Sequence, residues 1–221
     1  SVIGVFEMLG CVGVRKHYIL AGISLVFGAM PIVPFFAGES TLKIIAALCV
    51  VYLIAVYATD VFSKGKLDYA LSSSTFMGVF YIAVSFSSIV LLRGEGKYLY
   101  LLVFIGPWVS DTFAYIFGRL LGKHKLIPEV SPKKTIEGSV AGIIFAALSY
   151  VLYAFIISKN FDTAATPNYI VMAVAGALVS VVSQVGDLSA SAVKRHFGIK
   201  DYGFIFPGHG GVMDRFDSVI M

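Results

Sequence analysis

Three aspartates near the end of the chain could together bind a metal ion. Asp214 and Asp217 are three positions apart in the stretch FPGHGGVMDRFDS, so they share one face if a helix begins there. Asp187 lies in the apolar stretch before them, on the polar side of a predicted helix. Carboxylate oxygens are the ligands that Mg²⁺ prefers in proteins. We therefore predict a Mg²⁺ site with three ligands, Asp187, Asp214 and Asp217.

Positive side chains and glycines surround these aspartates in the sequence. The glycines of PGHGG allow the backbone to approach a ligand closely. His209, which lies among them, could bind phosphate, donate a proton or cap the turn. Guanidinium and ammonium groups suit phosphate oxygens. The pattern indicates a metal–phosphate site, and its catalytic residues are predicted to be Asp187, Lys194, Arg195, His209, Asp214 and Arg215.

A second basic stretch, GKHKLIPEVSPKKTIEGS, has a pattern of its own. Ser131 followed by Pro132 predicts a helix N-cap and a first-turn proline. Lys133 and Lys134 would then lie in the first turn, where free N–H groups and the helix dipole already favour an anion. Lysines are usually disfavoured at that end of a helix, so two of them there indicate a bound phosphate.

Polar groups also interrupt the apolar stretches. A carboxylate inside a membrane span is costly, and Asp111 lies well inside such a stretch. A polar stripe follows at helical spacing, made of Ser180, Ser183, Gln184, Asp187, Ser191 and Lys194. This stripe should line a cavity or pack against another polar helix, although an aspartate neutralised by a lysine for structural reasons is the alternative. The predicted substrate-binding residues are Asp111, Lys133, Lys134, Ser191 and Lys200.

The elements that position these residues are predicted to be membrane-spanning helices. The chain is 58% hydrophobic and only 14% charged, whereas soluble domains are about 25% charged. Stretches of about 20 apolar residues can cross a bilayer, and six occur here: Tyr18–Ala37, Ile44–Phe62, Ser72–Leu92, Tyr98–Leu121, Gly138–Ile157 and Tyr169–Val193. We expect an all-α, polytopic integral membrane bundle with at least six complete spans. The opening SVIGVFEML and the closing VIM are expected to be parts of further helices at both ends.

The charge distribution predicts which side of the membrane the motifs face. Positive residues concentrate in loops on the cytoplasmic side of a membrane. Most of the 17 lysines and arginines fall in the first, third, fifth and seventh connections, which include both basic motif regions. We therefore expect residues 1–97 to form N-terminal transmembrane helices with a partial first span. Residues 98–221 are expected to form a catalytic transmembrane region with cytoplasmic motif loops.

The motifs resemble those of the CDP-diglyceride synthetases, also called phosphatidate cytidylyltransferases. The resemblance lies in Ser191-Ala-Val-Lys194-Arg195, then Lys200-Asp201-Tyr-Gly203, then FPGHGGVMDRFD from Phe206 to Asp217. The upstream stretches SDTFAY and SPKKTIEG are similar to segments of the same family. The resemblance therefore runs from about Ser110 to the end of the chain, and earlier residues agree only in hydropathy.

The resemblance implies an enzyme that makes CDP-diacylglycerol and pyrophosphate from CTP and phosphatidic acid in phospholipid biosynthesis. It also implies a homodimer that requires Mg²⁺, with K⁺ as a second cation in some members. Carried over, Asp187, Asp214 and Asp217 would bind metal, the lysines, arginines and His209 would bind phosphates, and Asp111 and Ser191 would line the pocket. We expect a multi-pass protein of the cell inner membrane with its active site facing the cytoplasm. Its partners would be CTP and membrane lipid, with no nucleic acid.

A secondary transporter for an anionic substrate is the main alternative. Intramembrane aspartates and proline-interrupted helices also describe transport pathways. The charged residues gather toward one membrane face and no internal repeat is evident, which favours the enzyme. A CDP-alcohol phosphotransferase is disfavoured because no Asp-Gly pair occurs in the chain. A structural membrane protein without catalysis is also disfavoured, because Asp187, Asp214 and Asp217 would then be costly and have no function.

Overall fold

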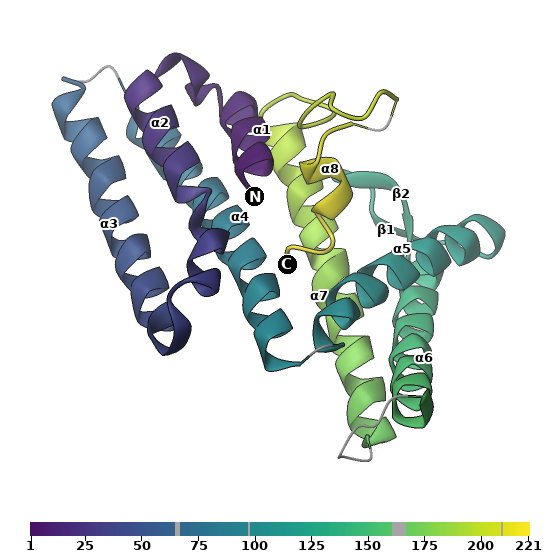
Figure 1. Ribbon diagram of the computed structural model, residues 1–221. Helices are drawn as coiled ribbons and strands as arrows, with labels where there is room; N and C mark the ends of the chain where they lie inside the picture. The colour runs from purple at the N-terminus through teal and green to yellow at the C-terminus, as the bar shows by residue number, and fades with distance from the viewer. Residues whose placement is uncertain (65–66, 97, 161–166, 209) are drawn as a thin grey trace. The chain divides into compact units, whose positions relative to one another are not determined.

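Helices dominate the computed structural model, which describes residues 1–64, 67–96, 98–160, 167–208 and 210–221 (Figure 1). Within these described residues, six helical segments are long and apolar enough to cross a membrane: Tyr18–Phe35, Gly38–Phe62, Tyr69–Glu95, Leu99–Leu120, Ile136–Lys159 and Tyr169–His196. They match the six predicted stretches closely. In a bilayer every backbone polar group must find a partner within the protein, so long apolar runs become helices. The prediction of an all-α polytopic membrane protein is confirmed.

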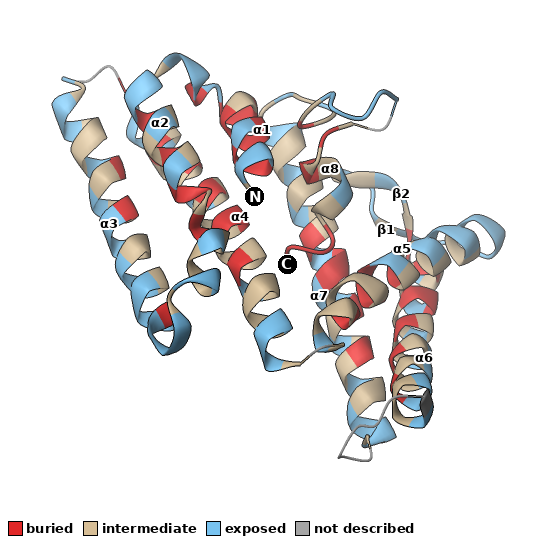
Figure 2. Cartoon of the chain, in the orientation of Figure 1, coloured by how far each residue is buried: buried red, intermediate tan, exposed pale blue. Residues whose placement is uncertain are grey.

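The outer faces of these helices are apolar as well as exposed. Figure 2 shows that exposed and intermediate residues cover most of α3 (Thr41–Phe62). Its side chains Val51, Ile54 and Val61 are 60%, 62% and 75% exposed. Exposure of so much apolar surface would be unfavourable in water. Lipid tails are the surroundings that suit it.

The chain divides into two compact units. The first comprises Ser1–Gly96 and His196–Phe216, and the second comprises Lys97–Arg195 and Asp217–Met221. The division means that the C-terminal motif contributes to both units. Asp214 and Arg215 belong to the first unit, whereas Asp217 belongs to the second.

The first unit is built from α1 (Val2–Val12), α2 (Tyr18–Phe27), α3, α4 (Tyr69–Glu95) and the short α8 (Met213–Phe216), with 3₁₀ turns η1 (Val14–Lys16), η2 (Met30–Phe35) and η3 (Gly38–Ser40). Helix α1 packs against α4 and also contacts α8. Val5, Val79 and Ile82 are fully buried at the centre of this packing. Pro31 and Pro34 lie in η2, where the predicted first complete span leaves α-helical geometry.

The second unit contains η4 (Leu99–Leu101), α5 (Leu102–Leu120), α6 (Ile136–Asn160) and α7 (Tyr169–His196), with a two-stranded sheet of β1 (Lys125–Ile127) and β2 (Ser131–Thr135). Helices α5 and α6 form the most extensive helix contact of this unit. A Cβ atom added to Gly138 of α6 would lie 3.0 Å from Gly118 Cα of α5. Glycines at this crossing let the two backbones approach closely.

The stretch before α6 corrects one prediction. Residues Ser131–Thr135 form strand β2, paired antiparallel with β1, so Lys133 and Lys134 lie on a strand and not in a first helical turn. The helix begins at Ile136, and the hydroxyl of Thr135 accepts a hydrogen bond from the N–H of Gly138 at 3.2 Å. Thr135 therefore takes the capping role predicted for Ser131.

The end of the chain corrects a second prediction. Helix α8 spans only Met213–Phe216, so Asp217 lies beyond it and does not share a helical face with Asp214. The following segment packs on α7 within the second unit. A Cβ atom added to Gly186 would lie 2.9 Å from the carbonyl oxygen of Asp217, so a glycine is needed next to Asp187.

Candidate active site

A pocket of about 460 Å³ in the second unit collects the predicted polar residues. Helices α5, α6 and α7 and both strands contribute to its wall. Four residues predicted from the sequence line it, Asp111, Lys133, Lys134 and Asp187. Asp111 and Asp187 are 76 positions apart in the chain, and both line this cavity because the helices that carry them belong to the same unit.

Two further cations line this pocket that the sequence reasoning missed. They are Arg119 near the end of α5 and Lys125 at the start of β1. Arg119 is eight positions after Asp111, or about two helical turns, so it lies on the same helical face. Following the helical face of Asp111 for two turns would have found it. Lys125 has no such signal, because its position depends on the sheet.

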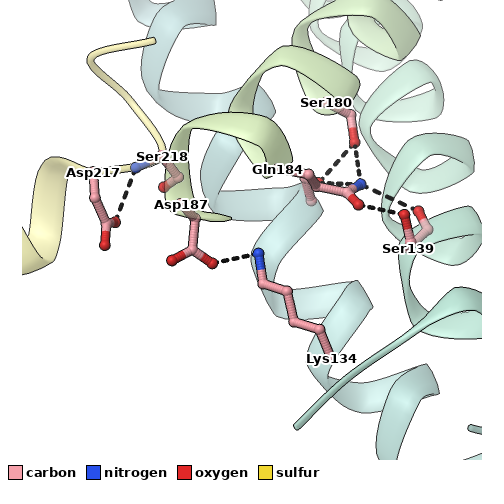
Figure 3. Close-up of polar contacts among 8 residues, drawn as sticks. Lys134, Ser139, Ser180, Gln184, Asp187, Asp217 and Ser218 are labelled. Carbon is pink, nitrogen blue, oxygen red and sulfur yellow. Dashed lines mark hydrogen bonds and ion pairs between the residues drawn. The ribbon is translucent and has the colours of Figure 1, made fainter. Parts of the chain in front are cut away.

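Lys134 of β2 forms an ion pair with Asp187 of α7 (Figure 3). Both side chains are about one quarter exposed, at 24% and 25%. This is the neutralising contact that the structural alternative expects. The pocket nevertheless holds four cations, Arg119, Lys125, Lys133 and Lys134, against two aspartates, Asp111 and Asp187. The excess of positive charge suits an anionic ligand.

From Asp187 toward the N-terminal end of α7, the polar stripe continues as a hydrogen-bonded layer (Figure 3). The amide nitrogen of Gln184 donates to Ser180 Oγ at 3.1 Å, and Ser139 Oγ donates to the amide oxygen of Gln184. Ser180 Oγ lies 2.7 Å from the hydroxyl of Ser110 on α5. The stripe was expected either to line a cavity or to pack against a polar helix, and different residues do each. Gln184 and Asp187 line the cavity, while Ser180 packs against polar groups of a neighbouring helix.

Asp217 carries a carboxyl group whose protonation is strongly perturbed. Burial, together with the negative charge of Asp187, raises the pKa of Asp217 to about 7, against the opposing effect of the positive charge of Lys194. Its Oδ1 accepts the N–H of Ser218 at 2.9 Å. The two carboxylates are therefore near enough to repel each other. A divalent cation between them would relieve that repulsion.

The chemistry of this pair fits Mg²⁺. Proteins usually hold Mg²⁺ with one or two carboxylates and leave the other positions to water and substrate phosphates. Asp187 and Asp217 supply such a pair within the second unit. Across the described residues, no group of three or more His, Cys, Asp or Glu side chains lies so that it could hold a metal ion. The three-aspartate ligand set remains a prediction.

Asp214 has a different local role in the first unit. Its Oδ2 accepts hydrogen bonds from the backbone N–H groups of Tyr202 at 2.8 Å and Gly211 at 2.9 Å. Gly210 has a positive φ of 85°, and a Cβ atom added to it would lie 2.9 Å from the same oxygen. One oxygen of Asp214 thus organises the turn that precedes α8.

The remaining predicted residues are distributed over both units. Ser191, Lys194 and Arg195 follow Asp187 along the last turns of α7. Lys200 lines a second pocket of about 690 Å³ in the first unit, together with Arg15. Arg215 lies on α8. His209 lies outside the described residues.

Comparison with known proteins gives consistent matches over the whole chain. The model of the cytidylyltransferase family matches residues 1–221. A phosphatidate cytidylyltransferase of Staphylococcus haemolyticus is 35% identical over 205 residues, which cover 90% of this chain and 76% of that protein. The phosphatidate cytidylyltransferase of Staphylococcus saprophyticus is 42% identical over 158 residues, or 72% of this chain and 58% of that protein. That of Staphylococcus epidermidis is 40% identical over 163 residues, or 74% and 60%. The chain thus spans between 58% and 76% of the length of these relatives.

Proposed function

Because the chain belongs to the cytidylyltransferase family, a family of nucleotidyltransferases, we propose that it transfers a cytidylyl group from CTP to phosphatidic acid. The products would be CDP-diacylglycerol and pyrophosphate. The observation that carries this proposal is the pocket of the second unit, where Asp111 and Asp187 meet four cations among membrane-spanning helices. A charged pocket in an apolar bundle suits a reaction between a soluble nucleotide and a lipid.

The chemistry requires no activated serine or cysteine. The phosphate of phosphatidic acid is already an anionic nucleophile, and one of its oxygens would attack the α-phosphorus of CTP. The bond from that phosphorus to the β-phosphate bridging oxygen breaks, and pyrophosphate leaves with the electron pair. The barrier comes from repulsion between two polyanions. The site must therefore bring anions together and neutralise the charge that develops on the leaving group.

The pocket residues can supply that neutralisation. Arg119, Lys125 and Lys133 line the cavity and are proposed to contact phosphate oxygens. Lys134 would exchange its partner Asp187 for a substrate phosphate when the nucleotide arrives. Asp187 and Asp217 are proposed to hold Mg²⁺, which when bound polarises phosphate oxygens and stabilises the leaving pyrophosphate. Lys194 and Arg195 extend the positive charge along α7.

The location and assembly of the enzyme are part of the proposal. The basic connections favour a cytoplasmic active site in a multi-pass protein of the cell inner membrane. A homodimer and a K⁺ ion beside Mg²⁺ are carried over from the family resemblance alone. The name of the relatives supports phosphatidic acid as the lipid.

The test is cytidylyl transfer by the full-length protein in detergent–lipid micelles. Labelled CTP, phosphatidic acid and Mg²⁺ are supplied, and label is measured in the lipid phase. We expect transfer that requires phosphatidic acid and is lost with EDTA or in Asp187→Asn. A folded, metal-replete protein that transfers no label would refute the proposal. Uptake of an anion into proteoliposomes by the same sample would then favour the transporter.

A further inference from the structure

We propose that Glu7 is a positioning residue for this reaction, which holds Gly203 and the motif segment Gly210–Asp214 in their active arrangement. The inference rests on the proposed function and concerns a residue outside the motifs themselves. Glu7 lies in the middle of α1, near the start of the chain, and its side chain is only 2% exposed. A carboxyl group buried this deeply needs hydrogen-bond partners, since its burial is otherwise costly.

The partners of Glu7 are backbone N–H groups of the motif segment. Its Oε1 accepts from Val212 at 2.9 Å, and its Oε2 accepts from Met213 at 2.8 Å. These contacts join residues more than 200 positions apart within the first unit. Both oxygens of Glu7 are therefore committed to the turn that leads into α8.

These contacts replace a missing helix cap. Val212 directly precedes α8, in the place of an N-cap residue, but its side chain has no hydrogen-bond acceptor. The first N–H groups of a helix have no partner within the helix. Glu7 accepts two of them from a distant part of the chain, which fixes where α8 begins and how it is directed.

Two motif glycines are shaped to receive Glu7. A Cβ atom added to Gly203 would lie 2.7 Å from Glu7 Cδ, and one added to Gly211 would lie 2.6 Å from Glu7 Oε2. Neither glycine has a positive φ, so their backbone conformations do not require glycine. The close approach of the Glu7 carboxyl group is what excludes a side chain at both positions.

Glu7 and Asp214 act on the same turn. The N–H of Gly211 is bound by Asp214 Oδ2, and the next two N–H groups are bound by Glu7. Three consecutive N–H groups thus depend on two carboxyl groups. Loss of Glu7 should therefore alter the placement of Asp214 and Arg215 while leaving their chemistry intact.

The experiment compares Glu7→Gln with wild type in the full-length protein. Glutamine keeps the volume of the side chain, but its NH₂ group would face one N–H donor of the turn. We expect kcat for cytidylyl transfer to fall by about tenfold or more, with KM for CTP changed by less than about threefold. We also expect faster amide hydrogen exchange in a peptide covering Tyr202–Phe216, with the rest of the chain unchanged. Glu39→Gln, an exposed glutamate, is the matched control and should behave as wild type.

The outcomes separate positioning from a general structural role. Glu7→Gln with wild-type kcat and wild-type exchange would overturn the proposal, as would a lower folded yield with unchanged kcat per folded enzyme. If Glu7→Gln does not fold, Glu7→Asp keeps the charge but shortens the reach, and the same pattern of kcat and exchange is expected. A wild-type protein without transfer activity would instead contradict the proposed function, and the exchange measurement would still test the Glu7 contacts.

Discussion

Lys134 and Asp187 form an ion pair at the wall of the pocket, although we propose that each of them binds a different partner during the reaction. Asp187 is proposed for Mg²⁺ and Lys134 for phosphate. A pair of this kind keeps two charged groups satisfied before substrates arrive. The exchange of partners is favourable only if metal and nucleotide bind together, because either alone would leave one of the two charges without a partner.

Lys134→Ala should therefore affect more than one contact. It removes a phosphate-binding cation and leaves Asp187 without its ion-pair partner. We expect kcat/KM for CTP to fall by about 10- to 100-fold, as is typical when a charged partner is lost. Steady-state transfer kinetics measure the effect. Lys43→Ala, which removes an exposed lysine of α3, is the control, and an equal loss in that variant would remove the special role of Lys134.

Asp187→Asn and Asp217→Asn test the metal-binding pair. Each substitution removes one charged ligand and almost no volume. We expect each to lower activity by at least about a hundredfold and to raise the Mg²⁺ concentration that gives half-maximal activity. A titration with Mg²⁺ at saturating CTP measures both quantities. Glu129→Gln, an exposed acid in the β1–β2 connection, should leave them unchanged. Normal Mg²⁺ dependence in both aspartate variants would rule out this pair as the metal site.

Arg119→Ala and Lys125→Ala test the cations that the sequence reasoning missed. Both residues line the pocket but lie outside the C-terminal motif. If they contact the phosphates of CTP, each variant should raise KM for CTP by about fivefold or more, since one charge-assisted contact is lost. Arg93→Ala, an exposed arginine at the end of α4, serves for comparison. Unchanged KM values would confine phosphate binding to Lys133, Lys134 and the α7 cations.

Gly138→Ala tests the close crossing of α5 and α6. The added methyl group would press against the backbone of Gly118 at 3.0 Å. Overpacking of this kind costs about 1–3 kcal/mol, so the thermal unfolding midpoint in detergent should fall. Gly22→Ala in α2 is a matched control, because an added Cβ meets nothing within 4 Å there. Helix propensity predicts an equal or slightly higher midpoint for that variant. A Gly138→Ala midpoint no lower than wild type would show that the crossing can relax.

The sequence was most informative about the membrane-spanning helices and about four of the residues that line the pocket. The bilayer leaves apolar runs little choice but to be helical, so all six spans were predicted. Asp111 and Asp187 were recognised because charge is costly inside such runs. Both line the pocket together with the two predicted lysines.

Contacts between distant residues explain what could not be predicted. Ser131 and Pro132 have the local pattern of a helix start, but pairing with β1 makes this segment a strand. A strand forms only where a second segment pairs with it, and the local sequence pattern does not show which segment that is. Glu7 carried the same signal as Asp111, a carboxyl group in an apolar run, but its partners Val212 and Met213 could not be identified because they offer only backbone N–H groups. Asp217 lies beyond α8, since that helix ends after one turn.

The hydrogen-bonded layer at Gln184 has a consequence for the membrane as an electrical barrier. Gln184 lies 11 residues before Arg195, so this pocket residue is about 16 Å along α7 from the charged end of the helix. A water-filled shaft of this depth could let protons leak across the bilayer and discharge the potential that the cell maintains. The side chains of Ser110, Ser139, Ser180 and Gln184 bind one another at its floor. From there to Tyr169 at the other end, α7 carries no charged residue. The layer thus closes the polar pocket with side chains whose donors and acceptors are paired with one another, and an uncharged stretch of α7 separates it from the far end of the helix.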